Sequence, residues 1–146
     1  MKQVKKILFP IDFAESYDSL LPWVSTFVEK FDATLYVVFV AQDLSSYSTF
    51  YVPHGNIQSF QEEAQQAAEK RMAQAANDQF KNFSKLETVV LMGSPAEKIL
   101  ELAKKENIDL IIMGAHGRKG LERVFFGSVA DKVVTGALCP VITIHP

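Results

Sequence analysis

Residues 108–128, IDLIIMGAHGRKGLERVFFGS, place a short apolar run directly before a loop of glycines and cations. The run IDLIIMG has the length and the apolar character of a strand that is buried on both faces. Residues 128–139 follow with a helical pattern, and Gly127 or Ser128 is available as the N-cap. A buried strand, a glycine-containing loop and a helix in this order are typical of a parallel α/β sheet.

Hydrophobic periodicity predicts the same alternation along the rest of the chain. Further buried strands are predicted at 5–11 and 33–41, and two more strands at 86–93 and 140–145. Further helices are predicted at 16–32, 57–83 and 94–107. Each crossover is long enough to join parallel strands, and right-handed crossovers then yield a doubly wound sheet. We expect a Rossmann-like, five-stranded parallel sheet of order 3-2-1-4-5, with helices on both faces and a single domain over residues 1–146.

Local signals set the expected limits of two helices. Pro22 fits the first helix if that helix starts near Ser19, because the proline then lies in the first turn. In the helix that follows the 86–93 strand, Ser94 is the expected N-cap and Pro95 the first residue. Glu97 stands at the third position, so the spacing predicts a capping box.

The middle of the chain combines a polar loop with a long helix. Residues 42–56 contain several serines, Pro53 and Gly55, and we expect a long loop there. The helix that follows has an expected apolar side formed by Phe60, Ala64, Ala67, Ala68, Met72, Ala75 and Phe80.

Composition excludes several classes of protein. Apolar residues make up 48% of the chain and charged residues 22%, which is typical of a globular domain. The net charge of −2 provides no general attraction for nucleic acid. The one dense cationic stretch, HGRKGLER, is too short to cover a duplex. We therefore expect no nucleic-acid partner.

Three further observations bear on location. The apolar run near the N-terminus ends at Pro10, which is too early for a signal peptide, and no run reaches the roughly 18 residues of a membrane span. The single cysteine, Cys139, rules out an internal disulfide and is expected to be a small buried apolar residue. We expect a cytoplasmic protein that does not insert into membranes.

The candidate site lies where the parallel strands end. Ligands of open parallel sheets bind beyond the carboxyl ends of the strands, where FPID, FVAQD and MGAHGRKG converge here. Gly114 and Gly117 would allow close backbone approach and positive φ. Gly127 and Ser128 open a helix, whose free N–H groups and positive dipole end favour phosphate. The alternative is a flexible surface loop that ends in a glycine helix cap.

Cations and a hydroxyl add to this site. The Ser128 hydroxyl can donate to a phosphate oxygen, and Arg118, Lys119 and Arg123 would supply counter-charge. The loop is not a Walker A sequence, because no Gly-Lys-Ser/Thr follows a glycine at the required spacing. It is also not the glycine fingerprint of dinucleotide-binding folds, since PIDFAES after the first strand contains no glycine.

Signs of an enzyme are weak. The chain has neither a nucleophile elbow nor an HExxH motif. Asp12 and Ser16 lack a histidine nearby in the sequence to act as a base. No residue stands out as a group that would position water at a terminal phosphate. We expect at most slow hydrolysis of a bound phosphate ligand.

The glycine spacing resembles that of ATP-binding universal stress proteins. Gly114, Gly117, Gly127 and Ser128 match the pattern G-x2-G-x9-G-[ST] of that family. ILFPIDFAES is similar to the family's first strand, GSPAEKIL to the start of its third helix, and 109–144 to its carboxyl half. The resemblance covers the whole chain and is weakest over 42–60.

This resemblance implies a site for ATP, AMP or ADP. The adenine and ribose would contact Pro10, Ile11, Asp12 and Val40. The phosphates would lie along Gly114, Ala115, His116, Gly117, Arg118, Lys119, Gly120, Gly127, Ser128 and Val129. For Asp12 the alternative role is to cap the following turn, and for His116 it is a solvated loop position.

The resemblance also bears on the metal and on the assembly. Mg²⁺ would be carried by the phosphates without protein ligands. Some ATP-binding relatives have a second hydroxyl two positions beyond the serine, where this chain has Ala130. The family commonly forms homodimers through its last strand, here Val141–Ile144, which is expected at the edge of the sheet.

The function implied is a nucleotide-binding module in stress response or regulation, acting on a protein partner that the sequence does not name. Two alternatives stay open. One is a weak ATP-hydrolysing or phosphotransfer enzyme. The other is a dimeric interaction module that does not need nucleotide.

Overall fold

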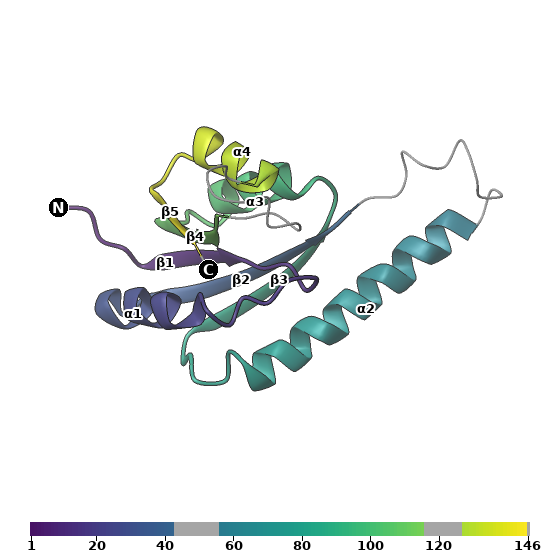
Figure 1. Ribbon diagram of the computed structural model, residues 1–146, viewed down its shortest axis with the longest axis horizontal. Helices are drawn as coiled ribbons and strands as arrows, with labels where there is room; N and C mark the ends of the chain where they lie inside the picture. Colours follow the sequence, from purple (N-terminus) through teal and green to yellow (C-terminus); the bar gives the residue numbers. More distant parts are fainter. Residues whose placement is uncertain (43–55, 116–126, 146) are drawn as a thin grey trace.

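A five-stranded parallel sheet forms the centre of the molecule (Figure 1). This computed structural model describes residues 1–42, 56–115 and 127–145. The strands are β1 Lys6–Pro10, β2 Thr34–Ala41, β3 Leu86–Met92, β4 Leu110–Gly114 and β5 Val141–Ile144. Their order is β3-β2-β1-β4-β5, and every neighbouring pair is parallel. The predicted fold class and strand order are confirmed.

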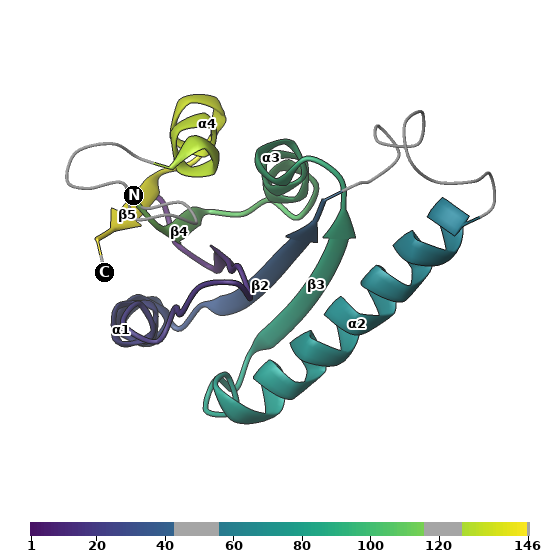
Figure 2. The same cartoon turned by 45° about the vertical axis from the view of Figure 1, so that its right-hand side comes forward.

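Helices cover both faces of this sheet. They are α1 Leu21–Phe31, α2 Asn56–Asp78, α3 Pro95–Lys105 and α4 Ser128–Gly136. Figure 2 shows α1 and α2 on one side of the strands and α3 and α4 on the other. The sheet is therefore doubly wound, as right-handed crossovers from a central first strand require.

Strand β1 supplies side chains to two apolar cores. Ile7 and Phe9 face α1 and α2, whereas Leu8 lies between them in sequence and faces α3 and α4. All three side chains are fully buried. Val24 of α1 joins the first core, and Val133 of α4 joins the second. A strand buried on both faces must be apolar throughout, which explains the continuous run.

The helix limits agree with the sequence patterns in part. Helix α1 begins at Leu21, so Pro22 lies in its first turn as expected. Ser94 is the N-cap of α3, but its side chain makes no capping hydrogen bond, so the predicted capping box is not formed. The first turn is closed by the backbone instead, where the Lys98 N–H donates to the Ser94 carbonyl at 2.9 Å. Pro95 presets φ for this turn.

Helix α2 buries less of its apolar side than predicted. Ala68, Met72 and Ala75 are buried, whereas Phe60 and the two alanines that follow it on this side are exposed. A 23-residue helix is about 35 Å long, and the eight-residue strand β2 is only about 26 Å long. The first half of α2 therefore extends beyond the sheet (Figure 1).

Two helices end earlier than the sequence predicts. The helix predicted at 57–83 ends at Asp78, and the one predicted at 128–139 ends at Gly136.

Cys139, which was expected to be buried, is only partly buried, at the margin of the core beside α4. Burial raises the pKa of its thiol, and the negative charge of Asp109 raises it further. In the part of the chain that the structure describes, no helix is long and apolar enough to cross a membrane.

Candidate functional site

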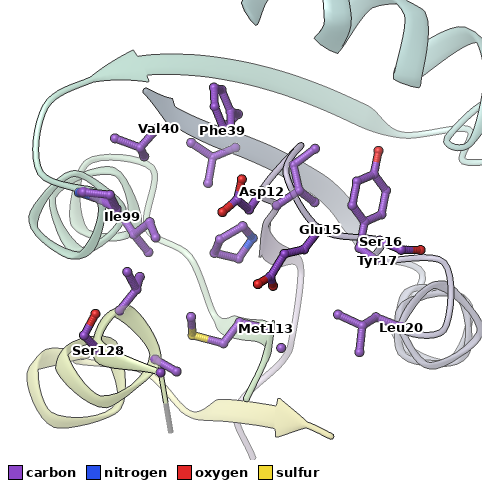
Figure 3. Close-up of a pocket in the computed structure, with 18 of the residues that line it drawn as sticks. Asp12, Glu15, Ser16, Tyr17, Leu20, Phe39, Val40, Ile99, Met113 and Ser128 are labelled. Carbon is purple, nitrogen blue, oxygen red and sulfur yellow. The ribbon is translucent and has the colours of Figure 1, made fainter. Parts of the chain in front are cut away.

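A cavity of about 340 Å³ lies at the carboxyl ends of β1, β2 and β4. Strands β1 and β4 are neighbours, but the helices that follow them, α1 and α4, lie on opposite faces of the sheet. The two following segments diverge, and a crevice opens between them. Its volume falls in the range of small-molecule sites. Figure 3 shows the side chains that surround it.

Eight of the predicted site residues line this cavity. They are Pro10, Ile11, Asp12, Val40, Gly114, Gly127, Ser128 and Val129. Segments separated by more than a hundred residues thus meet at one place. The predicted residues His116, Gly117, Arg118, Lys119 and Gly120 lie outside the described residues, and so does Arg123.

Ala115, also predicted, connects two parts of the site. It is fully buried, and its N–H donates to the Ile144 carbonyl of β5 at 2.9 Å. Its own carbonyl accepts a hydrogen bond from the Gly127 N–H at 2.8 Å. The first bond ties Ala115 to β5, and the second holds it next to Gly127 at the start of α4, although eleven residues lie between Ala115 and Gly127 in the chain.

Asp12 caps the turn that follows β1, which is the alternative role that its sequence position allows. Its Oδ1 accepts a hydrogen bond from the Ala14 N–H at 2.9 Å, which closes a turn directly after β1. The same carboxylate lines the cavity, and Figure 3 shows it directed toward the centre. The turn therefore orients Asp12 toward any ligand in the cavity.

Gly114 is needed for space, and the expected positive φ is not observed there. It ends β4 in extended backbone, and among the described glycines only Gly93 has a positive φ. A Cβ at Gly114 would lie 3.3 Å from Cδ1 of Leu20. An alanine would therefore require the Leu20 side chain, which lines the cavity, to shift by a few tenths of an ångström.

The start of α4 presents to the cavity backbone donors that have no backbone acceptor among the described residues. Gly127 is the N-cap and has no side chain to satisfy them, and the Asp131 N–H makes the first helical bond, to the Gly127 carbonyl. The N–H groups of Ser128, Val129 and Ala130 precede that bond and have no acceptor within the helix. Together with the helix dipole, these donors favour an anion at this end of the cavity.

The described lining contains two carboxylates and no lysine or arginine. Asp12 and Glu15 both line the cavity. Figure 3 shows Glu15 directed toward Met113. The donors that this lining offers to an anion are therefore backbone N–H groups and the uncharged side chains of Ser16, Gln42 and Ser128. No group of three or more metal-ligating side chains occurs among residues 1–42, 56–115 and 127–145.

The geometry agrees with a comparison across known families. A family model for the universal stress protein family matches residues 3–145. This chain belongs to the universal stress protein family.

Individual universal stress proteins are similar along nearly the whole chain. Universal stress protein MJ0531 of Methanocaldococcus jannaschii is 34% identical over 143 residues, which cover 96% of this chain and 81% of the relative. The solved structure of MJ0577 has a TM-score of 0.83 at 25% identity, covering 99% of this chain and 98% of the other. A universal stress protein from Archaeoglobus fulgidus, solved in complex with dAMP, has a TM-score of 0.65. At 21% identity, over 96% of this chain and 97% of that one, it shows the shared fold.

Sequence patterns missed much of the apolar wall of this universal stress protein. The additional lining residues are Glu15, Ser16, Tyr17, Leu20, Val38, Phe39, Gln42, Pro95, Ile99, Met113 and Ala130. Met113 stands near the end of β4, a position from which it was predictable, whereas Val38 lies in the middle of β2 beside the end of β1. The segment after β1 and the approach of α3 depend on tertiary packing, for which a single sequence carries no direct signal.

Proposed function

We propose that this universal stress protein binds an adenine nucleotide in the cavity and acts as a regulatory module in stress response. The observation that carries the proposal is the meeting of an apolar crevice with the uncapped start of α4. An adenine nucleotide has the corresponding two ends, an apolar base and a charged phosphate. A protein of the same fold was solved with dAMP, which supports this class of ligand.

The base and the ribose would occupy the side formed by β1, β2 and α3. Val38, Val40 and Ile99 provide apolar contact there, and Pro10 and Ile11 follow the central strand. The Asp12 carboxylate would accept hydrogen bonds from ribose hydroxyls, because an ionised carboxylate acts only as an acceptor.

The phosphates would occupy the side formed by Gly114 and α4. The N–H groups at Ser128 and Val129 and the Ser128 hydroxyl would donate to phosphate oxygens. Our sequence-based assignment extends this contact to residues 115–120. Mg²⁺ would arrive with the phosphates of ATP or ADP. Ala130 lines the cavity without a hydroxyl, which removes one contact to a triphosphate and keeps AMP among the candidates.

A homodimer through β5 is the second part of the proposal. Strand β5 has β4 on one side and no described neighbour on the other. Leu138, just before this strand, is 91% exposed. Trp23 is also exposed and belongs to α1, which lies near β5 in both views (Figures 1 and 2). Exposed apolar side chains beside an open strand edge favour pairing with a second copy.

Two other functions compete with regulation by nucleotide. A weak ATP hydrolase or phosphotransferase would use the same cavity and would show steady turnover. A nucleotide-independent interaction module would retain its partner unchanged when nucleotide is removed. A module that needs no nucleotide leaves unexplained why helix N–H groups without a side-chain cap line the cavity, whereas a hydrolase is distinguished from a regulatory module by its turnover. A cytoplasmic location, where adenine nucleotides are available, fits the proposal.

The experiment compares Ser128→Ala with wild type by calorimetric titration of ATP and of adenosine. We expect Ser128→Ala to bind ATP about tenfold more weakly, the low end of what a hydrogen bond to a charged group contributes. Adenosine carries no phosphate, so its affinity is expected to stay the same. Mass spectrometry of ligand released from purified protein would identify the nucleotide that is bound in cells.

Thr135→Ala is the matched control. It also removes a hydroxyl from α4, but Thr135 donates to the Asp131 carbonyl and does not line the cavity. Absence of binding by both ligands to wild type would refute nucleotide binding. If Ser128→Ala weakened the affinities for ATP and for adenosine by the same factor, Ser128 would not contact phosphate.

A further inference from the structure

Residues 12–18 separate the cavity from helix α2. On one side of this segment, Asp12, Glu15 and Ser16 line the cavity. On the other side lies a second groove, which the same segment forms with residues 71–79. None of the described residues of α2 lines the cavity itself. The 12–18 segment therefore offers a bound ligand a direct connection to α2.

Arg71 of α2 holds the first half of this segment. Its guanidinium lies over the Phe13 ring, 4.6 Å from the ring centre, and Nη2 donates to the Phe13 carbonyl at 3.2 Å. The Phe13 ring in turn lies 4.6 Å from the Phe39 ring, centre to centre. Phe39 lines the cavity. Three side chains in contact thus connect α2 with the cavity wall.

Gln79, the residue after α2, holds the second half. Its Oε1 accepts a hydrogen bond from the Tyr17 hydroxyl, and its Nε2 donates to Oδ1 of Asp18 at 3.1 Å. The Tyr17 ring stacks on Phe80 with centres 5.8 Å apart. Figure 3 shows the Tyr17 hydroxyl directed away from the centre of the cavity, although the residue lines it. One amide therefore binds two residues of the 12–18 segment, of which Tyr17 lines the cavity.

We propose that Arg71 and Gln79 are positioning residues that couple the nucleotide cavity to helix α2. The proposal rests on nucleotide binding in the cavity. A ligand that orders residues 12–18 stabilises their contacts with Arg71 and Gln79, and hence the second half of α2. By thermodynamic linkage, a partner that holds α2 changes the affinity for nucleotide by the same factor. The exposed first half of α2 makes the helix accessible to such a partner.

The test is amide hydrogen exchange of the full chain with and without AMP, together with AMP affinities. In wild type we expect AMP to slow exchange in cavity segments 10–12 and 127–130, and also in residues 68–79. In Arg71→Gln and in Gln79→Leu the cavity segments stay protected, but the protection of 68–79 is lost. AMP affinity falls roughly fivefold in each variant, the low end of measured couplings between sites.

Matched controls separate positioning from a general effect on the helix. Lys70→Gln removes the same charge from the neighbouring residue, and Gln66→Leu makes the same change as Gln79→Leu, and neither of these residues lines the groove. Both controls should behave as wild type. Arg71→Lys keeps the charge but not the flat guanidinium, so it should restore only part of the protection. Circular dichroism checks that each variant is folded.

The possible outcomes distinguish this inference from the proposed function. Slower exchange in the cavity segments without any change in 68–79 would overturn the coupling and leave nucleotide binding intact. Protection of 68–79 that persists in both Arg71→Gln and Gln79→Leu would overturn the positioning roles. No change in either region would refute both the coupling and the proposed function.

Discussion

Two carboxylates line a cavity that we propose to hold a phosphate ligand, and their local environments differ. Asp12 is held by the turn to Ala14, next to the proposed ribose position. Glu15 comes three residues after Asp12 on the same segment and points toward Met113, near the end of β4 where the phosphates would begin. Like charges repel, so Glu15 would act against the more highly charged nucleotides.

The charge of Glu15 leads to a prediction about selectivity. Glu15→Gln should increase the affinity for ATP by about two- to fivefold, the range that a partly solvated pair of charges contributes. The affinity for adenosine should stay the same, because adenosine carries no charge for Glu15 to repel. Titration of both ligands against wild type measures the difference.

A second variant on the surface of α1 controls for the change in net charge. Glu29→Gln removes the same charge at an exposed position that does not line the cavity. It should leave both affinities unchanged. An unchanged or reduced ATP affinity in Glu15→Gln would show that this carboxylate does not face the phosphates.

At the scale of elements, the hydrogen bonds of β5 show which backbone groups face its open edge. The carbonyls of Pro140 and Ile144 accept hydrogen bonds from Ile111 and Ala115, at the side of β4. Backbone direction alternates along a strand, so the N–H groups of Val141 and Thr143 point the other way. A second copy of the strand would bond to these groups.

This alternation predicts the effect of a proline in β5. Thr143→Pro removes an N–H group that points to the open edge and leaves the bonds to β4 in place, as proline at a sheet edge allows. We expect the dissociation constant of the dimer to rise at least about tenfold, because a two-fold symmetric interface loses the hydrogen bond of this N–H group in both copies. Sedimentation velocity over a range of concentrations measures it.

Thr143→Ala keeps the N–H group and serves as the control. It should remain dimeric. If Thr143→Pro dimerises as strongly as wild type, the interface lies elsewhere. If wild type is monomeric at all concentrations, the homodimer proposal is wrong.

Elements with a strong local signal were predictable from the sequence. The apolar runs of β1 and β4 have no polar face, which indicates burial on both sides and hence a parallel sheet. Their order predicts that the eight cavity residues named above meet at one edge of the sheet. Gly127 as helix cap was predictable for the same reason, because the strand-loop-helix pattern is local.

The remaining features depend on contacts between distant parts of the chain. Glu15, Tyr17 and Leu20 line the cavity because the segment after β1 turns back, and that turn is held from α2 by Arg71 and Gln79. Such contacts have no periodicity along the sequence. The exposed first half of α2 was missed because its alanines suit a helix whether or not a sheet covers them.

At the scale of the whole molecule, Tyr17 belongs to the first core and to the cavity wall at once. It is buried beside Phe9 and Phe80, with its hydroxyl bonded to Gln79. Burial raises the pKa of the Tyr17 hydroxyl, the charge of Asp18 raises it further, and the charge of Arg71 lowers it. The folded state therefore holds this proton more tightly than the unfolded chain does.

The sign of this shift predicts how stability changes in alkaline solution. The Tyr17 hydroxyl contributes fully to the free energy of unfolding below pH 10, near the ordinary pKa of tyrosine. This contribution is lost as pH rises through the higher pKa of Tyr17 in the folded state. At pH 7, Tyr17→Phe should lower the free energy of unfolding by about 1 kcal/mol, the value of one hydrogen bond. Above pH 10 the difference from wild type should shrink and then vanish.

Urea unfolding of both proteins from pH 7 to pH 11 measures this. Other tyrosines and the lysines titrate in both proteins, so the difference between them isolates Tyr17. A difference that stays constant over the whole range would show that the Tyr17 proton is not held by the fold.

The central position of β1 also matters while the protein is being made. Lys6 donates its backbone N–H to Asp109, 103 residues later, and β1 gains its second neighbour only when β4 is complete. A ribosome releases the chain from its N-terminus, so β1, β2 and β3 emerge first and one edge of β1 stays open. Open apolar edges of this kind pair readily with other chains. The start of α4 emerges later still, so a nascent chain could acquire its complete binding cavity only near the end of translation.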